Sequence, residues 1–168
     1  MTKIITWANN KGGSAKTTTT TIVAHGLTMM LEKATDNNKI LVVDTDSQAH
    51  STLLLCGHAN FADEASLIGV LNAQRENSNS AEQIRNKIVE SNWHPNLHIL
   101  PVAEGLGLDN VEAGLNGYDG NVFYLERILQ KIKKDYALIF IDTSPKFSLL
   151  TKQAQQESLP HHLQVMPS

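Results

Sequence analysis

Two short runs in which nearly every residue is apolar constrain the fold of this chain most strongly. They are "ILVVD", Ile40 to Asp44, and "YALIFID", Tyr136 to Asp142. A strand that is apolar at successive positions is apolar on both faces, and such strands occur in parallel sheets that helices cover on each side. The sequence therefore predicts an α/β fold with a mostly parallel sheet flanked by helices.

The rest of the chain alternates between strand and helix patterns, which predicts right-handed crossovers within one sheet. Further strands are expected at Lys3–Ala8, Asn96–Pro101 and His162–Pro167, and helices at Lys16 to about Lys33, near Ala65–Ala73, Ala81–Glu90, Val122–Lys134 and Leu149–Gln156. A length of 168 residues suits one domain, residues 1–168.

Composition narrows the classes of function. The formal net charge is −3, so the chain has no overall basic signature for nucleic acid. The local cluster "KIKK", Lys131 to Lys134, is interpreted as a solvated helix face. No apolar run approaches the length that spans a bilayer, and one cysteine suits a reducing compartment. We expect a cytoplasmic protein.

The stretch "WANNKGGSAKTTTT", Trp7 to Thr20, places a glycine loop between a strand and a helix. Gly12 and Gly13 allow backbone N–H groups to wrap a phosphate chain, and Lys16 lies at the helix start, where the helix dipole also favours an anion. Thr17 stands where a hydroxyl normally binds magnesium. This stretch predicts a phosphate-binding loop.

The loop departs from the standard pattern G-x-x-x-x-G-K-[ST]. Asn10 and Ala15 stand at the two glycine positions, and Lys11 is an additional lysine. If residue 15 must take a positive φ, alanine costs on the order of 1 kcal/mol there.

Three aspartates follow predicted strands at the edge where open α/β sheets bind ligands. In "VVDTDSQAHST", Val42 to Thr52, Asp44 and Asp46 either solvate and cap a strand end or hold a magnesium-bound water. In "YALIFIDTSP", Asp142 follows four apolar residues, which is the arrangement of a Walker B strand.

Together these stretches resemble the ParA/MinD family of deviant Walker A ATPases, and the ParA partition branch most closely. "KGGSAKTTTT" is similar to K-G-G-x-x-K-[ST], "DTDSQAHST" to D-x-D-P-Q-G-N-x-[ST], and "YALIFIDTSPKFSLLT" to D-x-x-[IL]-I-D-x-P-P-x-x-x-x-[LT]. The resemblance covers nearly the whole chain in the family's order.

The resemblance implies a Mg-dependent ATPase with a defined set of site residues. Lys11, Lys16 and Asp46 would be catalytic, with Lys11 reaching the phosphates of the partner subunit in an ATP-dependent homodimer. Thr17, Asp46 and Asp142 would hold Mg²⁺, partly through water. The nucleotide would be bound by Lys11, Gly12, Gly13, Ser14, Ala15, Lys16, Thr17, Thr18, Asp44 and Asp142.

Several positions differ from the family pattern. Ala15 replaces glycine, Ser47 and Ser144 replace prolines, and His50 replaces asparagine. We expect weaker nucleotide binding from the first change and altered hydrolysis from the others. Family members also usually continue well beyond "VMPS", so the chain would correspond to the N-terminal two-thirds of the family domain.

The resemblance implies a slowly hydrolysing ATP switch that partitions plasmid or chromosomal DNA. Non-specific DNA and a ParB-like centromere-binding protein would be its partners, with no membrane, and retained DNA binding would place it on the nucleoid. Two alternatives stay open: a cargo-positioning ATPase of the same type, and a non-catalytic nucleotide-binding or interaction module.

Overall fold

A single sheet forms the centre of the computed structural model, which describes residues 2–7, 15–33, 38–76, 78–115, 124–145 and 149–158. In these ranges five strands pair in the order β1-β5-β2-β4-β3. Their bounds are β1 Lys3–Trp7, β2 Ile40–Thr45, β3 Val89–Ser91, β4 His94–Leu100 and β5 Leu138–Thr143. All neighbours pair in parallel except β3, which is antiparallel to β4. The predicted α/β class is confirmed.

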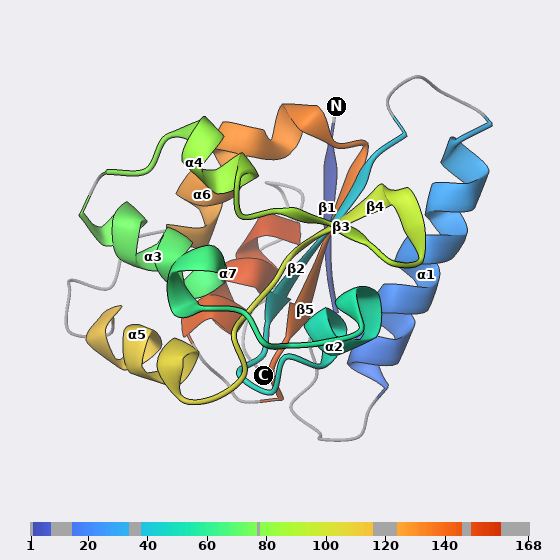
Figure 1. The fold of residues 1–168 in the computed structure, drawn as a ribbon. Helices are drawn as coiled ribbons and strands as arrows, with labels where there is room; N and C mark the ends of the chain where they lie inside the picture. The colour runs from blue at the N-terminus through green and yellow to red at the C-terminus, as the bar shows by residue number, and fades with distance from the viewer. Residues whose placement is uncertain are drawn as a thin grey trace, which may run out of the picture.

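Helices cover both faces of this sheet (Figure 1). One face carries α1, Lys16–Leu31, and α2, His50–Cys56. The other carries α3 Leu67–Arg75, α4 Ala81–Arg85, α5 Gly107–Leu115, α6 Tyr124–Ile132 and α7 Leu149–Ser158. Two short 3-10 turns, Asp63–Ala65 and Lys133–Asp135, precede α3 and follow α6. Within the described ranges, no helix is both long and apolar enough to cross a membrane.

The apolar strands divide their side chains between two cores. All six positions of β2 are buried. Leu41 and Val43 lie in the core beneath α3 and α6, whereas Ile40 and Val42 lie in the core beneath α1. Successive side chains of a strand point to opposite faces, so a run without polar residues fits between two helix layers.

The predicted elements match the structure except at a few places. The helix predicted at Ala81–Glu90 is wrong beyond Arg85, because Val89–Ser91 pairs with β4 and forms the edge strand β3. The first residue of the helix predicted near Ala65 belongs to a 3-10 turn. Helices α2 and α5 were not predicted. The strand predicted at His162–Pro167, and Val122 and Phe123 of the helix predicted at Val122–Lys134, lie outside the described residues.

Local hydrogen bonds explain where two helices begin. Ser80 and Gln83 form a capping box at α4: the Ser80 hydroxyl accepts from the Gln83 amide at 3.1 Å and the Gln83 side chain accepts from the Ser80 amide at 2.7 Å. Ser66 caps α3 by accepting from the Ile68 amide at 3.2 Å.

The "KIKK" cluster has a structural role at its first residue. Lys131 donates from Nζ to Gln74 Oε1 at 3.0 Å and to the Asn79 carbonyl at 2.7 Å. It therefore ties α6 to the end of α3 and the loop that follows, while the residue stays exposed, as the interpretation of a solvated helix face predicts.

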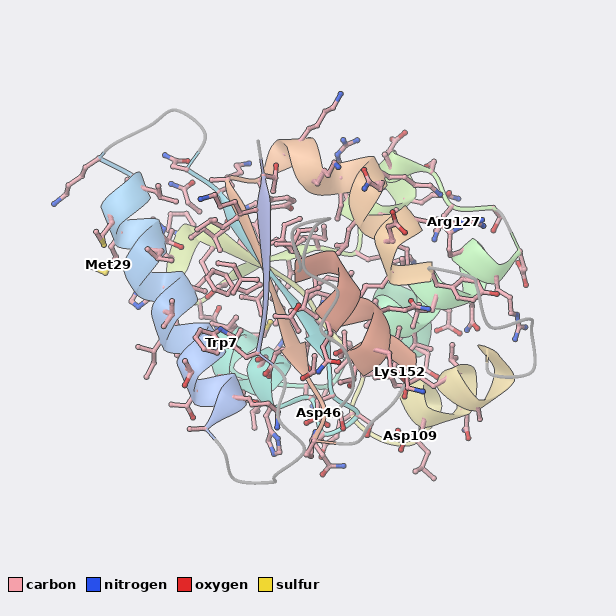
Figure 2. The ribbon with its side chains drawn as sticks, turned by 180° about the vertical axis from the view of Figure 1, so that it is seen from behind. Trp7, Met29, Asp46, Asp109, Arg127 and Lys152 are labelled. Atoms are coloured by element: carbon pink, nitrogen blue, oxygen red, sulfur yellow. The ribbon has the colours of Figure 1, made fainter. Side chains whose placement is uncertain are left out.

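The outward face of α1 is apolar. Ile22, Met29 and Met30 are 58%, 53% and 69% exposed, and Met29 points away from the sheet in Figure 2. Beside the second half of the helix, the Trp93 ring meets His25 edge-on, with the ring centroids 5.5 Å apart. An amphipathic surface helix normally turns polar residues outward, and α1 does not.

Gly69 gives a test of this packing. A Cβ at Gly69 would lie 2.5 Å from the Glu64 carbonyl oxygen, so Gly69→Ala would push α3 off the 3-10 turn before it. We expect the free energy of unfolding to fall by about 1–3 kcal/mol in urea denaturation. Gly26→Ala is the matched control, because nothing lies within 4 Å of that position in α1. It should raise stability by about 0.5–1 kcal/mol. Equal effects of the two changes would contradict this packing.

Candidate functional site

The carboxyl ends of β1, β2 and β5 meet at one edge of the sheet. Asp142 is the register partner of Asp44 on one side and of Trp7 on the other. Figure 2 shows Asp46 at this edge, near the first turn of α1. The predicted juxtaposition of the strand-end aspartates with the start of that helix is therefore present.

The start of α1 presents Lys16 and Thr17 to this edge. Ala15 precedes the helix with φ 57° and ψ 21°, and its carbonyl accepts from the Thr19 amide at 2.8 Å. The free N–H groups and the dipole of a helix N-terminus favour an anion there. Lys11, Gly12, Gly13 and Ser14 lie outside the described residues, so their roles stay predictions.

Asp44 is fully buried and strongly held. Its Oδ2 accepts from the Thr52 hydroxyl at 2.7 Å and the Thr52 amide at 2.8 Å, and its Oδ1 accepts from the Asp46 amide at 3.1 Å. Burial, followed by the nearby charge of Asp142, raises the pKa of Asp44 from 3.8 to about 7, although these hydrogen bonds act in the opposite direction.

Asp142 is also fully buried and is held from α2. The Ser51 hydroxyl donates to its Oδ2 at 2.7 Å. Burial raises the pKa of Asp142, and the hydroxyls of Ser51 and Thr17 lower it. Asp142 Oδ1 has no hydrogen-bond partner among the residues that the structure describes. Because a buried carboxylate oxygen is costly to leave unpaired, this atom indicates room for a further donor.

Asp46 and the first turn of α1 line one pocket of about 560 Å³. The Asp46 carboxylate accepts from the Gln48 amide at 3.0 Å, which fixes the turn that leads into α2. The pocket is lined by Ala15, Lys16, Thr17, Thr18, Asp46, Ser47, Gln48, His50, Leu53, Leu54, Thr143, Ser144 and Pro145. Its lining contains a lysine and an aspartate beside two leucines, which suits a ligand that has both an anionic and an apolar part.

A larger pocket, of about 720 Å³, lies at the opposite ends of the strands, where its lining includes Lys39, Tyr136 and the salt-bridged pair Arg85 and Asp135. Among the described residues, its lining contains none of the strand-end aspartates and no residue of the first turn of α1. We therefore take the smaller pocket as the candidate functional site, because buried and charged side chains occur together there.

Sequence reasoning missed the residues that hold the aspartates. Ser51 and Thr52, in the first turn of α2, each donate a hydroxyl to one aspartate. The hydroxyl pair directly after "DTDSQAH" was a usable signal, because a helix beside buried carboxylates needs donors that face them.

Two alanines in this region take the left-handed conformation. Ala15 has φ 57°, as the conditional prediction required, and Ala49 has φ 52° and ψ 32° just before α2. Ala49 stands at the glycine of the family pattern D-x-D-P-Q-G-N, a difference that sequence reasoning overlooked. Each alanine costs about 1 kcal/mol in this conformation.

The chain matches known proteins over most of its length. A family described as an AAA domain, AAA_31, matches residues 2–158. Plasmid partition protein A of Escherichia coli is 24% identical over 90% of this chain and 39% of its own length. The cell division protein PomZ of Myxococcus xanthus is 28% identical over 87% and 40%, respectively.

Solved structures share the fold. A cobyrinic acid a,c-diamide synthase from Mycobacterium smegmatis with bound ADP and magnesium has a TM-score of 0.70 at 28% identity, covering 92% of this chain and 55% of that one. The septum site-determining protein MinD of Pyrococcus horikoshii, complexed with Mg-ADP, has a TM-score of 0.67 at 26% identity, covering 94% and 55%. The chain belongs to this AAA-domain family and is a P-loop protein of the ParA/MinD type. It spans 39% to 52% of the length of the curated relatives that it matches.

Replacing the two left-handed alanines by glycine tests whether strain is stored beside the pocket. Ala15→Gly and Ala49→Gly should each raise the free energy of unfolding by about 1 kcal/mol, since glycine adopts this conformation without steric cost. Urea denaturation of the single variants measures the change. Ala24→Gly, inside α1, is the control and should lower stability because glycine weakens a helix interior. A loss of stability on all three changes would rule out relief of strain.

Proposed function

We propose that this chain is an ATP-binding and slowly hydrolysing molecular switch of the ParA type, acting in plasmid or chromosome partition through ATP-dependent dimerisation. The observation that carries the proposal is that Asp46 lines one pocket together with the first turn of α1, beside the buried strand-end pair Asp44 and Asp142. In such a switch the strand-end carboxylates respond to the phosphates bound at the helix start.

The phosphates would lie at the start of α1. Lys16 would contact the β- and γ-phosphates and Thr18 the α-phosphate, with the backbone amides of residues 12–15 around them. Lys16 and Thr18 both line the pocket, and Lys16 is close enough to Asp142 to lower the pKa of that carboxyl. A lysine beside a helix N-terminus is suited to a polyphosphate.

The described residues fit Mg²⁺. The Thr17 hydroxyl and the carboxylates of Asp46 and Asp142 are oxygen donors, which this ion prefers, and Asp142 Oδ1 still lacks a partner in the described part of the chain. Thr17 would hold the ion directly, and Asp46 and Asp142 partly through water. The ion would supply neutralisation of the phosphate charge.

Two residues would act on the γ-phosphate. Asp46, fixed by its hydrogen bond from the Gln48 amide, would orient the attacking water. Lys11 would reach the phosphates of the partner subunit. By analogy with an arginine finger, a cation supplied in this way contributes about 10³ to 10⁵ to the rate of phosphoryl transfer.

Two kinds of role are represented among the relatives, and those that act in partition support the proposal. A plasmid partition protein of Borrelia burgdorferi adds a structural match, with a TM-score of 0.64 at 27% identity. The match to PomZ, a cell division protein, favours cargo positioning as the second candidate. Partition further predicts non-specific DNA and a ParB-like protein as partners that stimulate hydrolysis, in the cytoplasm on the nucleoid.

Sedimentation with nucleotide tests the switch. Mg-ATP should co-sediment with the 168-residue chain and shift it to a dimer, whereas Mg-ADP should bind without that shift. Protein and nucleotide absorbance are followed together. Binding of neither nucleotide would overturn the proposal. Binding of Mg-ATP without hydrolysis, even with DNA and a partner present, would indicate the non-catalytic module.

Lys11→Ala separates dimerisation from nucleotide binding. We expect this variant to bind Mg-ATP within a few-fold of the parent but to lose the dimer and at least 10³ of any partner-stimulated rate, because its role is in trans. Lys33→Ala, an exposed lysine just beyond the far end of α1, is the control and should behave like the parent. A Lys11→Ala protein that dimerises and hydrolyses normally would exclude the proposed role of Lys11.

A further inference from the structure

Ser51 makes a contact that the family pattern does not prescribe. The pattern D-x-D-P-Q-G-N-x-[ST] leaves this position open, yet the Ser51 hydroxyl donates to Asp142 Oδ2 at 2.7 Å across 91 residues of sequence. Both residues are fully buried. A short hydrogen bond to a carboxylate in a dry environment is strong and directional.

This bond makes the two oxygens of Asp142 unequal. A free carboxylate turns about its Cβ–Cγ bond, so either oxygen can face a given neighbour. With Oδ2 engaged by Ser51, that rotation is blocked, and Oδ1 is left without a partner among the described residues. Thr17 and Lys16, on the first turn of α1, both lower the pKa of the same carboxyl group.

The backbone next to Ser51 is also held in place. Thr52, the next residue, holds Asp44 through its hydroxyl and its amide and accepts from the Val102 amide at 3.1 Å. The position of the Ser51 hydroxyl is therefore fixed from β2 and from the segment after β4.

We propose, on the basis of the proposed function, that Ser51 is a positioning residue that orients Asp142 so that Oδ1 is presented to the water shell of Mg²⁺. Ser51 touches neither the nucleotide nor the ion in this role. It acts by fixing which oxygen of Asp142 faces the site. Removing the Ser51 hydroxyl therefore reduces how much Mg²⁺ strengthens nucleotide binding, whereas nucleotide binding without Mg²⁺ changes little.

Calorimetry of ADP binding to the full 168-residue chain tests this, with ADP in Mg²⁺ and ADP in EDTA as the two probes. The ratio of the two dissociation constants reports the coupling. In Ser51→Ala we expect this ratio to fall about tenfold, as expected for losing a hydrogen bond to a charged group, while the constant in EDTA changes less than about twofold. Ser51→Thr, which keeps the hydroxyl, restores a ratio near that of the parent.

Ser66→Ala is the matched control, because it removes another fully buried serine hydroxyl, the cap of α3, outside the pocket. Its ratio should equal that of the parent. If Ser51→Ala does not unfold cooperatively, Ser51→Cys replaces it, since a thiol of similar volume is a weak donor. An unchanged ratio in a folded Ser51 variant overturns the positioning role alone. A parent chain that binds no ADP in either solution overturns the proposed function and this inference with it.

Discussion

The structure around the pocket depends on holding two like-charged side chains next to each other in the interior. Asp44 and Asp142 are register partners on adjacent strands, and both are fully buried. Burial raises the pKa of each carboxyl, and the charge of Asp142 adds to the rise at Asp44. Removing a carboxylate from water without compensation is unfavourable by several kcal/mol, so the neighbouring elements have to supply donors.

Helix α2 supplies most of them. It has seven residues, too few for an isolated helix to be stable in water. Ser51 and Thr52 join it to β5 and β2, and Thr52 also joins it to the segment after β4. One helical turn therefore connects three strand ends. A change in the charge near Asp142 acts directly on α2, because the Ser51 hydroxyl is hydrogen-bonded to that carboxylate.

Sequence reasoning succeeded where one residue pattern has one physical solution. The apolar runs that became β2 and β5 fit only a doubly covered sheet, and the strand, loop and helix order placed Lys16 and Thr17 correctly. It failed at β3, because Val89–Ser91 is a strand only by pairing with β4, a contact across the chain that local patterns do not contain. Helix α2 was missed because its alanine cap carries no capping signal, and the left-handed Ala49 resembles an ordinary helix former.

The placement of the aspartates followed from strand ends, but their hydrogen bonds did not. Ser51 and Thr52 are common residues whose partners are set by tertiary structure, and the unequal environments of the two Asp142 oxygens appear only once α2 is placed on the sheet. The roles of Lys11 to Ser14 stay predictions.

The two tryptophans of the chain lie in different places, one at the end of β1 and one beside α1, and their fluorescence can report on each place separately. Trp7 ends β1, 38% exposed, and its carbonyl accepts from the Thr143 hydroxyl beside Asp142. Trp93 is 36% exposed and lies edge-on to His25, near the exposed methionines. Because the rings are partly in water, emission from Trp7 reports on solvent at the phosphate end, and emission from Trp93 reports on whether anything covers the apolar side of α1. Single-tryptophan forms of this protein would carry two independent optical signals without any added dye.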